Sequence, residues 1–380
     1  MSQNSQVGGK LIGTGSFGCV FKPSLTCPKE KSRDEIVSKV FFGKDSLKEA
    51  KEEILIDSMV DKIKGHEKWC HIWYKRCKPG KYDKLIKKEP ELDDCLYENN
   101  ILESEFDKYR QMLQGSYAGI PLNKLIIEKF TKKTFSDKEL FKKEFLNLMK
   151  LMKPLFLGLK QMYHHKISHN DIKDENIMVD SDGCKYIDFG LACEFKNKAF
   201  FENRSKSEFI YDRVYPPYPY EFIYLYATPE VLKEEKYDKQ HKIYRSLHDR
   251  YVLIHEQIFG RRTHDNLLQV INRFIKDGSK IKNGVEGANI VSLIDTYSLG
   301  MLVPSVLCKL AKSYGKMKQL KHYLHLDKTK SFTDLLKHMT EPDNFNRMNP
   351  DDVYHKYIEL ETVYLKEKKV VKRTKRRRRR

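Results

Sequence analysis

The chain has 380 residues, of which 40% are hydrophobic and 12% aromatic, and its formal net charge is +19. This apolar content is enough to bury a core and argues against general disorder, while the length allows a few small domains or one bilobal domain. No apolar run approaches the roughly 18–20 residues that cross a bilayer, and the N-terminal MSQNSQVGGK has no stretch typical of a signal peptide. We therefore expect neither a secreted nor a membrane-integral protein.

The N-terminal part is predicted to be mostly strands. Residue alternation indicates two strands joined by a glycine turn over 10–22 and a third strand over 35–42, and helical spacing follows over 47–63. An insertion over 65–100, another strand over 110–114 and a linker over 115–119 complete this part. The insertion is charged and bears cysteines, and we expect it to be irregular.

The C-terminal part is predicted to be mostly helical. Apolar periodicity indicates a long buried helix over 138–165 with a kink at Pro154, and a second apolar helix over 295–310. Between them, residues 231–290 are polar and look like an insertion. The last fifteen residues, 366–380, contain eleven basic residues and one acidic residue, so this tail cannot bury a core and is expected to be disordered.

A glycine-rich turn lies between the first two predicted strands. Residues 13–20 read GTGSFGCV, which matches the pattern G-x-G-x-x-G-x-V. Glycines allow a hairpin backbone to approach phosphate oxygens where a side chain would collide. A Rossmann turn would need a following helix, and the flanking strands disfavour it. An ordinary hairpin turn is the alternative when this pattern is taken alone.

A lysine lies inside the third predicted strand. Lys39 follows Ile-Val-Ser, and a lysine in an apolar strand is costly unless it is paired. The natural partners are phosphates and a carboxylate of the next helix, where Glu49, Glu52 and Glu53 compete. Glu52 has apolar residues at +3, +4 and +7, so this periodicity favours Glu52, with Glu53 as the runner-up.

A third group of polar residues follows the long predicted helix. The segment 169–176 reads HNDIKDEN, and the sequence Asp188-Phe-Gly follows twelve residues after Asn176. Asp171 could orient or accept the proton of a substrate hydroxyl, and Lys173 could neutralise a transferring phosphoryl group. Asn176 and Asp188 offer the hard oxygen ligands that magnesium prefers.

In this order, the motifs resemble those of eukaryotic-type protein kinases over about residues 9–355. The resemblance implies an α+β, bilobal fold, with a small β-rich N-lobe over 1–115, a larger helical C-lobe over 116–365 and the tail over 366–380. It also implies ATP and Mg²⁺ as cofactors and protein hydroxyls as substrates. The implied nucleotide-binding residues are Ile12, Gly13, Thr14, Gly15, Ser16, Phe17, Gly18, Cys19, Val20 and Lys39; the implied catalytic residues are Asp171, Lys173, Lys39 and Glu52; and the implied metal ligands are Asn176 and Asp188.

Two further features depend on this resemblance. The segment 295–300, DTYSLG, resembles the family's helix start whose Asp braces the catalytic loop. Arg347 resembles the late arginine that pairs with a glutamate, and either Glu230 or Glu221 could be that partner, with Glu230 preferred because a proline precedes it. Asn170 replaces the arginine that usually receives an activation-loop phosphate, so we do not expect control by that route.

The position of the hinge between the lobes has two readings. Residues 125–130, LIIEKF, could be a strand plus hinge, but only four residues would then remain before Phe-Ser-Asp at 135–137 opens the next helix. Placing the hinge at 115–119 makes residues 120–130 a helix, and we prefer this second reading.

The eight cysteines contain no C-x-x-C pair, so we expect reduced thiols in a reducing compartment. A zinc cluster of Cys70, His71, Cys77 and Cys95 would fit no standard spacing. The lysine-rich style and long insertions resemble kinases encoded by large DNA viruses, which implies the cytoplasm or nucleus of an infected cell, or packaging in the virion.

The leading function is a serine/threonine protein kinase, because Lys173 two positions after Asp171 is the arrangement of that class. The alternatives are a small-molecule phosphotransferase and a pseudokinase-like scaffold or nucleic-acid-binding protein. A pseudokinase should have lost a catalytic residue, whereas all are present here. The basic tail favours a nucleic-acid or acidic partner in addition to protein substrates, and no membrane partner is expected.

Overall fold

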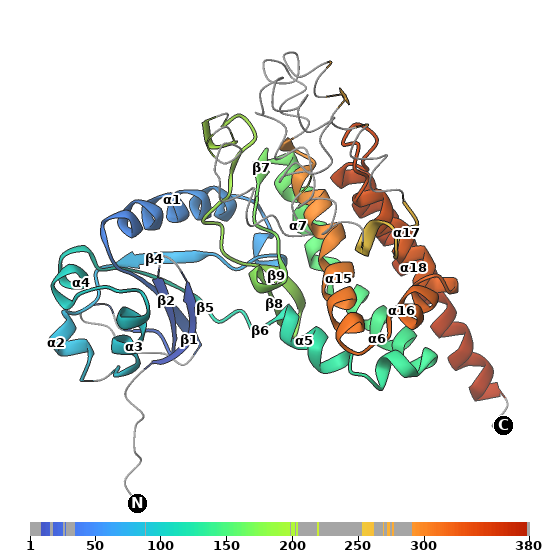
Figure 1. The fold of residues 1–380 in the computed structure, drawn as a ribbon, viewed down its shortest axis with the longest axis horizontal. Helices are drawn as coiled ribbons and strands as arrows, with labels where there is room; N and C mark the ends of the chain where they lie inside the picture. Colours follow the sequence, from blue (N-terminus) through green and yellow to red (C-terminus); the bar gives the residue numbers. More distant parts are fainter. Residues whose placement is uncertain are drawn as a thin grey trace, which may run out of the picture. The chain divides into compact units, whose positions relative to one another are not determined.

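A computed structural model of the chain divides into two compact units. Unit 1 comprises Met1–Gly119 and Ile187–Ala192, and unit 2 comprises Ile120–Tyr186 and Cys193–Arg380 (Figure 1). The structure describes residues 9–15, 18–25, 27, 35–87, 89–197, 199–201, 203, 219, 253–261, 269, 272–273, 276 and 291–377, with the side chains of the last range described up to residue 364. Unit 1 is rich in strands and unit 2 in helices, so the α+β, bilobal expectation is confirmed.

Unit 1 is built on a five-stranded antiparallel sheet in the order β1-β2-β3-β5-β4. The strands are β1 (Lys10–Gly15), β2 (Gly18–Lys22), β3 (Ile36–Phe41), β4 (Trp73–Cys77) and β5 (Gln111–Ser116). The strands predicted over 10–22, 35–42 and 110–114 are therefore confirmed. The edge strand β4 lies inside the segment 65–100, which was expected to be irregular, so that part of the expectation is wrong.

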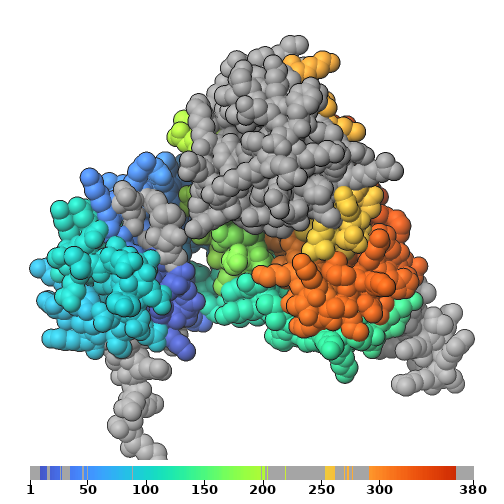
Figure 2. Space-filling model, in the orientation of Figure 1, coloured from blue at the N-terminus to red at the C-terminus, as the bar shows by residue number. Residues whose placement is uncertain are grey.

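Helices cover both faces of this sheet, because side chains alternate across a strand. On one face Phe41 and Leu113 pack with Ala50 of α1 (Lys44–Asp61). On the other face Val40 and Met112 join a larger cluster formed with three short helices, α2 (Tyr82–Leu85), α3 (Glu91–Glu98) and α4 (Glu103–Tyr109). In the space-filling view these three helices form the cyan surface of unit 1 (Figure 2).

Two disulfide bonds join this helical layer and β4 to the β2 strand and the segment that follows it. Cys19 bonds to Cys95 of α3, and Cys27 bonds to Cys77 at the end of β4. The expectation of reduced thiols is wrong for these four residues, and a zinc site that uses Cys77 and Cys95 is excluded by their bonding. The sequence did not reveal the pairs because their members lie 76 and 50 positions apart and meet only through the sheet.

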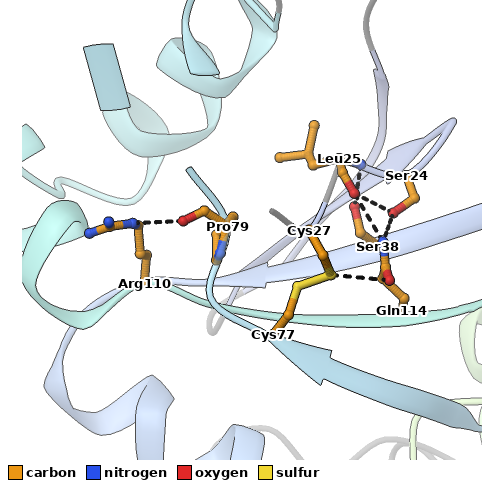
Figure 3. The surroundings of a disulfide bond; sticks show 8 residues. All are labelled: Ser24, Leu25, Cys27, Ser38, Cys77, Pro79, Arg110 and Gln114. Carbon is orange, nitrogen blue, oxygen red and sulfur yellow. Dashed lines mark hydrogen bonds between the residues drawn. A yellow bond between two sulfur atoms is a disulfide. The ribbon is translucent and has the colours of Figure 1, made fainter. Parts of the chain in front are cut away.

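The Cys27–Cys77 disulfide lies beside a group of hydrogen-bonded residues that includes Ser24, Leu25 and Gln114 (Figure 3). The side-chain amide of Gln114 donates to Ser24 Oγ at 2.8 Å and to the Leu25 carbonyl at 3.1 Å, and its Oε1 lies 3.3 Å from Cys27 Sγ. The Leu25 backbone N–H donates to Ser38 Oγ at 3.0 Å. These bonds satisfy buried polar groups and fix the chain after β2 to β3 and β5.

Unit 2 is mainly helical. Its longer helices are α5 (Leu122–Lys129), α6 (Lys138–Leu151), α7 (Lys153–His164), α15 (Ile294–Ser313), α16 (Met317–Leu324), α17 (Asp327–Met339) and α18 (Pro350–Arg377). Because α18 continues to Arg377, the expectation that the tail over 366–380 is disordered is wrong for its described part, residues 366–377. Asp137 caps α6 by accepting from two backbone N–H groups at 3.0 Å. The predicted helix over 138–165 is broken at Met152, just before Pro154, which sits in the first turn of α7.

Most of helix α15 is buried in unit 2. A Cβ at Gly300 would lie 2.7 Å from Thr340 Cγ2, so α15 and α17 pack more closely than a larger residue would allow. Small strands complete the unit: β6 (Ile120–Pro121), β8 (Ile177–Asp180) and β9 (Gly183–Tyr186) form one sheet, and β7 (Ile167–Ser168) pairs with β10 (Cys193–Glu194). Among the described helices, none has the length and apolarity needed to pass through a bilayer.

The helix α5 decides between the two hinge readings. Residues 122–129 form a helix, and the last strand of the unit 1 sheet along the chain is β5. The reading of residues 125–130 as a strand plus hinge is therefore wrong. The division between the units falls after Gly119. Most of the proposed insertion 231–290 lies outside the described residues. Within its described part, His255 is buried and hydrogen-bonds Tyr297 of α15 at 2.9 Å.

Candidate active site

The glycine turn joins β1 and β2, with Gly13 opposite Val20 and Gly15 opposite Gly18. A Cβ at Gly18 would collide with the Val40 carbonyl oxygen, so only glycine fits between these strands. Ile12 and Thr14 are exposed, and Cys19 is fully buried in its disulfide. Ser16 and Phe17, at the tip of the turn, lie outside the described residues.

Lys39 lies in β3 beside Val20 of the hairpin and is bonded to two carboxylates of unit 1. Its Nζ is 2.8 Å from Glu53 Oε2 and 3.4 Å from Asp188 Oδ1. Burial alone would lower the pKa of Lys39, but the charges of Glu53 and Asp188 outweigh it and raise the pKa above its ordinary value. Lys39 is therefore a fixed positive charge at neutral pH.

The partner of Lys39 is Glu53, and the preference for Glu52 is wrong. Glu52 is exposed and lies 3.7 Å from Lys48. The inner face of α1 carries two acids, Glu53 and Asp57, which are only 2% and 1% exposed. Helical periodicity favoured Glu52 because Leu55 lies three residues after it, but Leu55 is 62% exposed. The same periodicity disfavoured Glu53 because the residue four positions after it is the acidic Asp57.

Asp188 and Gly190 form a tight turn in unit 1. Asp188 has a φ of 61°, and its Oδ1 accepts from the Gly190 backbone N–H at 3.4 Å. A Cβ at Gly190 would lie 3.1 Å from that oxygen, so glycine leaves room for the carboxylate. The Asp188 side chain is 42% exposed and can reach a ligand as well as Lys39.

The segment 169–176 of unit 2 brings three of the predicted residues together. Lys173 Nζ lies 2.9 Å from Asp171 Oδ2. The side-chain amide of Asn176 donates to the same oxygen at 2.8 Å and to the Asp171 carbonyl at 3.0 Å. These donations orient the amide N–H groups toward Asp171, so the oxygen of Asn176 is the atom suited to a cation.

Asp295, at the start of α15, holds the segment 169–176 in place through hydrogen bonds to its first residues. Its carboxylate accepts the backbone N–H groups of His169 at 2.6 Å and Asn170 at 2.9 Å, and the Ser168 hydroxyl at 3.2 Å. Burial raises the pKa of Asp295, and the His169 charge and these hydrogen bonds oppose the rise. The expectation that this aspartate braces the loop is confirmed.

Asn170 is buried, and its side chain is hydrogen-bonded to neighbouring residues. Its Oδ1 accepts from Ser168 Oγ at 2.7 Å, and its Nδ2 donates to the Ser168 carbonyl and lies 3.4 Å from Cys193 Sγ. It therefore links the loop to β10. Of the other predicted pair, Arg347 donates to the Glu341 and Leu293 carbonyls, whereas Glu230 and Glu221 lie outside the described residues.

Trp73 of unit 1, which the sequence did not single out, also contacts the Lys39–Glu53 pair. The indole N–H of Trp73 donates to Glu53 Oε1 at 2.6 Å. A tryptophan at a strand edge is a common packing residue, so no sequence signal separates this role from burial alone.

Comparisons with known proteins agree with this geometry. A family model described as "Protein kinase domain" matches residues 112–368. The chain is 30% identical over 196 residues to the serine/threonine-protein kinase PSK1 of Saccharomyces cerevisiae, which covers 50% of this chain and 12% of that protein. It is 42% identical over 55 residues to the CTD kinase subunit alpha of the same yeast, which covers 14% of this chain and 10% of that protein. The matched regions thus span about a tenth of either relative.

Proposed function

Because the chain belongs to the protein kinase family, we propose that it is a serine/threonine protein kinase that transfers the γ-phosphoryl group of ATP to protein hydroxyls. The Ser/Thr preference is supported by Lys173 beside Asp171 and by the similarity to PSK1. The single observation that carries the proposal is the largely buried Lys39, which is 14% exposed, held by Glu53 and close to Asp188, because this costly arrangement matches a site for nucleotide phosphates.

Each residue of the site has a distinct part in this reaction. Lys39 would bind the phosphates of ATP, and Glu53 keeps its ammonium in place. Asp171 would orient the acceptor hydroxyl and take its proton, while Lys173 offsets negative charge on the moving phosphoryl group.

We propose Asp188 of unit 1 and Asn176 of unit 2 as the magnesium ligands, because each side chain carries an oxygen of the kind that this ion prefers. Asp188 offers a partly exposed carboxylate and Asn176 an amide oxygen, both hard ligands. When bound, Mg²⁺ supplies charge neutralisation at the phosphates. No cluster of three or more His, Cys, Asp or Glu side chains suited to a metal occurs among the described residues.

The test is phosphorylation of a mixed protein acceptor with γ-labelled ATP, followed by phosphoamino acid analysis. We expect phosphoserine and phosphothreonine from the wild type and none from Asp171→Asn. Dominant phosphotyrosine would refute the Ser/Thr assignment. Label that enters only small molecules would favour the phosphotransferase alternative, and nucleotide binding without transfer would favour a scaffold.

The tail and the setting of the protein complete the proposal. Residues 366–380 carry a dense positive charge that attracts polyanions, which supports a nucleic-acid or acidic partner. We propose that the chain acts in the setting of a large DNA virus, in the cytoplasm or nucleus of the infected cell or packaged in the virion; of these, the virion is the oxidising setting in which the two disulfides persist. The lysine-rich sequence with long insertions supports this source.

A further inference from the structure

Trp73 contacts the inner face of α1 through two separate polar groups. Its indole N–H donates to Glu53 Oε1 at 2.6 Å, and its backbone N–H donates to Asp57 Oδ2 at 2.9 Å. Glu53 and Asp57 are one helical turn apart, so they lie on the same side of α1. The first residue of β4 is thus attached to α1 at two points.

The position of the indole ring is fixed by packing. Trp73 packs on Phe41, Ala50 and Leu113, in the apolar cluster between the sheet and α1. Gly115 lies opposite it in β5, and a Cβ there would be 2.9 Å from Trp73 Cε3. A register irregularity follows Trp73 in the β4–β5 pair. The pairing of β4 with β5 and the space left by Gly115 therefore orient the indole N–H toward α1.

The Glu53 carboxylate is shared between Lys39 and Trp73. Oε2 bonds to Lys39 at 2.8 Å and Oε1 bonds to the indole at 2.6 Å. A carboxylate held at both oxygens has its rotation fixed. Without the indole, Oε1 would be a buried acceptor with a lost partner, and the carboxylate could turn away from Lys39.

The second acid on this face makes the arrangement costly. Asp57 is 1% exposed, and its Oδ1 makes no hydrogen bond within the described part of the chain. Buried, partly unsatisfied carboxylates destabilise a fold. Such a residue is expected where a contact is needed for function, and here its contact is the backbone of Trp73.

We propose that Trp73 is a positioning residue for phosphoryl transfer, which acts by holding the Glu53 carboxylate on Lys39 and α1 against β4. This inference rests on the proposed kinase function. Because β4 and α1 belong to the same unit, we expect the Lys39–Glu53 pair to form without a separate activator protein.

The direct test is Trp73→Phe, which keeps an aromatic ring and removes the indole N–H. We expect kcat to fall about tenfold to a hundredfold, with a smaller rise in the KM for ATP, because a charge-assisted hydrogen bond is lost. The matched control is Trp69→Phe, which changes the chain's other tryptophan, a fully buried residue of unit 1, and should keep kcat within about twofold.

A double-mutant cycle separates positioning from a merely structural role. If Trp73 acts through Glu53, Trp73→Phe should change kcat less than about twofold when Glu53→Gln is already present. Equal loss in both backgrounds, or wild-type kcat in Trp73→Phe, would overturn the inference. If Trp73→Phe does not fold, benzothienylalanine at position 73 keeps two fused rings without the N–H group and should show the same loss.

A second measurement does not depend on kinase activity. In Trp69→Phe the one tryptophan left is Trp73, so its fluorescence reports on the indole. Glu53→Gln in this background should shift the emission maximum, and an unchanged spectrum would contradict the contact. If Glu53→Gln shifts the emission maximum but the wild-type protein transfers no phosphate, the contact is supported and the proposed function is refuted.

Discussion

Reduction of the two disulfides is expected to destabilise unit 1 strongly. Cys19–Cys95 ties the strand after the glycine turn to α3, and Cys27–Cys77 ties the chain after β2 to the end of β4. Hydrogen bonds act in the same place, since Glu91 Oε2 accepts from the Leu11 backbone N–H at 2.5 Å. The glycine hairpin is thus fixed to the α2–α4 layer, and we expect reduction to raise the KM for ATP as well as to lower stability.

The magnitude follows from the loops that the disulfides close. The Cys27–Cys77 bond spans 50 positions, which corresponds to about 4 kcal/mol in the chain-entropy model. The Cys19–Cys95 bond spans 76 positions but encloses the first loop, so it adds a loop of about 26 residues and about 3.5 kcal/mol. The two together therefore give an upper limit of about 7–8 kcal/mol, comparable with the whole stability of many domains.

The assay is denaturant unfolding of protein prepared without reductant, before and after dithiothreitol, together with thiol counting by alkylation and mass spectrometry. Four of the eight cysteines, Cys70, Cys184, Cys193 and Cys308, should react in the denatured, unreduced protein, and all eight after reduction. The paired Cys→Ala variants should each lose about 2–4 kcal/mol, whereas Cys308→Ala should lose about 1 kcal/mol. Eight reactive thiols before reduction, or unchanged unfolding after it, would refute the reasoning.

Four further outcomes are expected. Lys39→Ala and Asp188→Ala should each leave less than about a tenth of wild-type phosphoryl transfer in a folded protein, measured with labelled ATP, because both act on charge in the transition state. Burial raises the pKa of Asp57, so the folded chain keeps a proton that the unfolded chain releases, and stability falls as pH rises between the two pKa values. Asp57→Asn should therefore flatten this fall and raise Tm at neutral pH by at least about 2 °C in thermal unfolding; a lower Tm would contradict it. Phosphatase treatment should leave activity intact, because Asn170 is neutral and bonded locally; a loss reversed by rephosphorylation would show that another basic residue has this role. Deletion of 366–380 should weaken nucleic-acid binding and flatten its salt dependence without changing peptide turnover, and unaltered binding would remove the proposed role of the tail.

The sequence predicted the elements whose signals are local. The strands around the glycine turn and the helix α15 have clear periodicity, and Asp295 could be assigned to the catalytic loop because its motif is contiguous. Asp171, Lys173 and Asn176 lie within six positions, so one turn of chain brings them together.

The missed features depend on contacts between distant segments. Glu53 could not be chosen over Glu52 from helical periodicity, because the inner face of α1 is partly acidic and one outer position is leucine. The disulfides needed the register of β2 and β4 within the sheet and the position of α3 over it. Trp73 needed the register of β4 on β5, which its own polar strand sequence, WYKRC, does not reveal.

The two anchored elements of unit 1 suggest how this kinase is controlled. In protein kinases, activity depends on the Lys–Glu ion pair, which movement of the helix that carries the glutamate can make or break. Here Trp73 and Asp57 attach that helix to β4, and the Cys19–Cys95 disulfide attaches the glycine hairpin to α3 in the opposite helical layer. Asn170 is already bonded to Ser168 and offers no charge to a phosphate. An enzyme with both elements held in place gains little from the repositioning that phosphorylation or an activator provides. We therefore expect basal activity close to maximal activity, and reduction of the disulfides is the perturbation that should lower it.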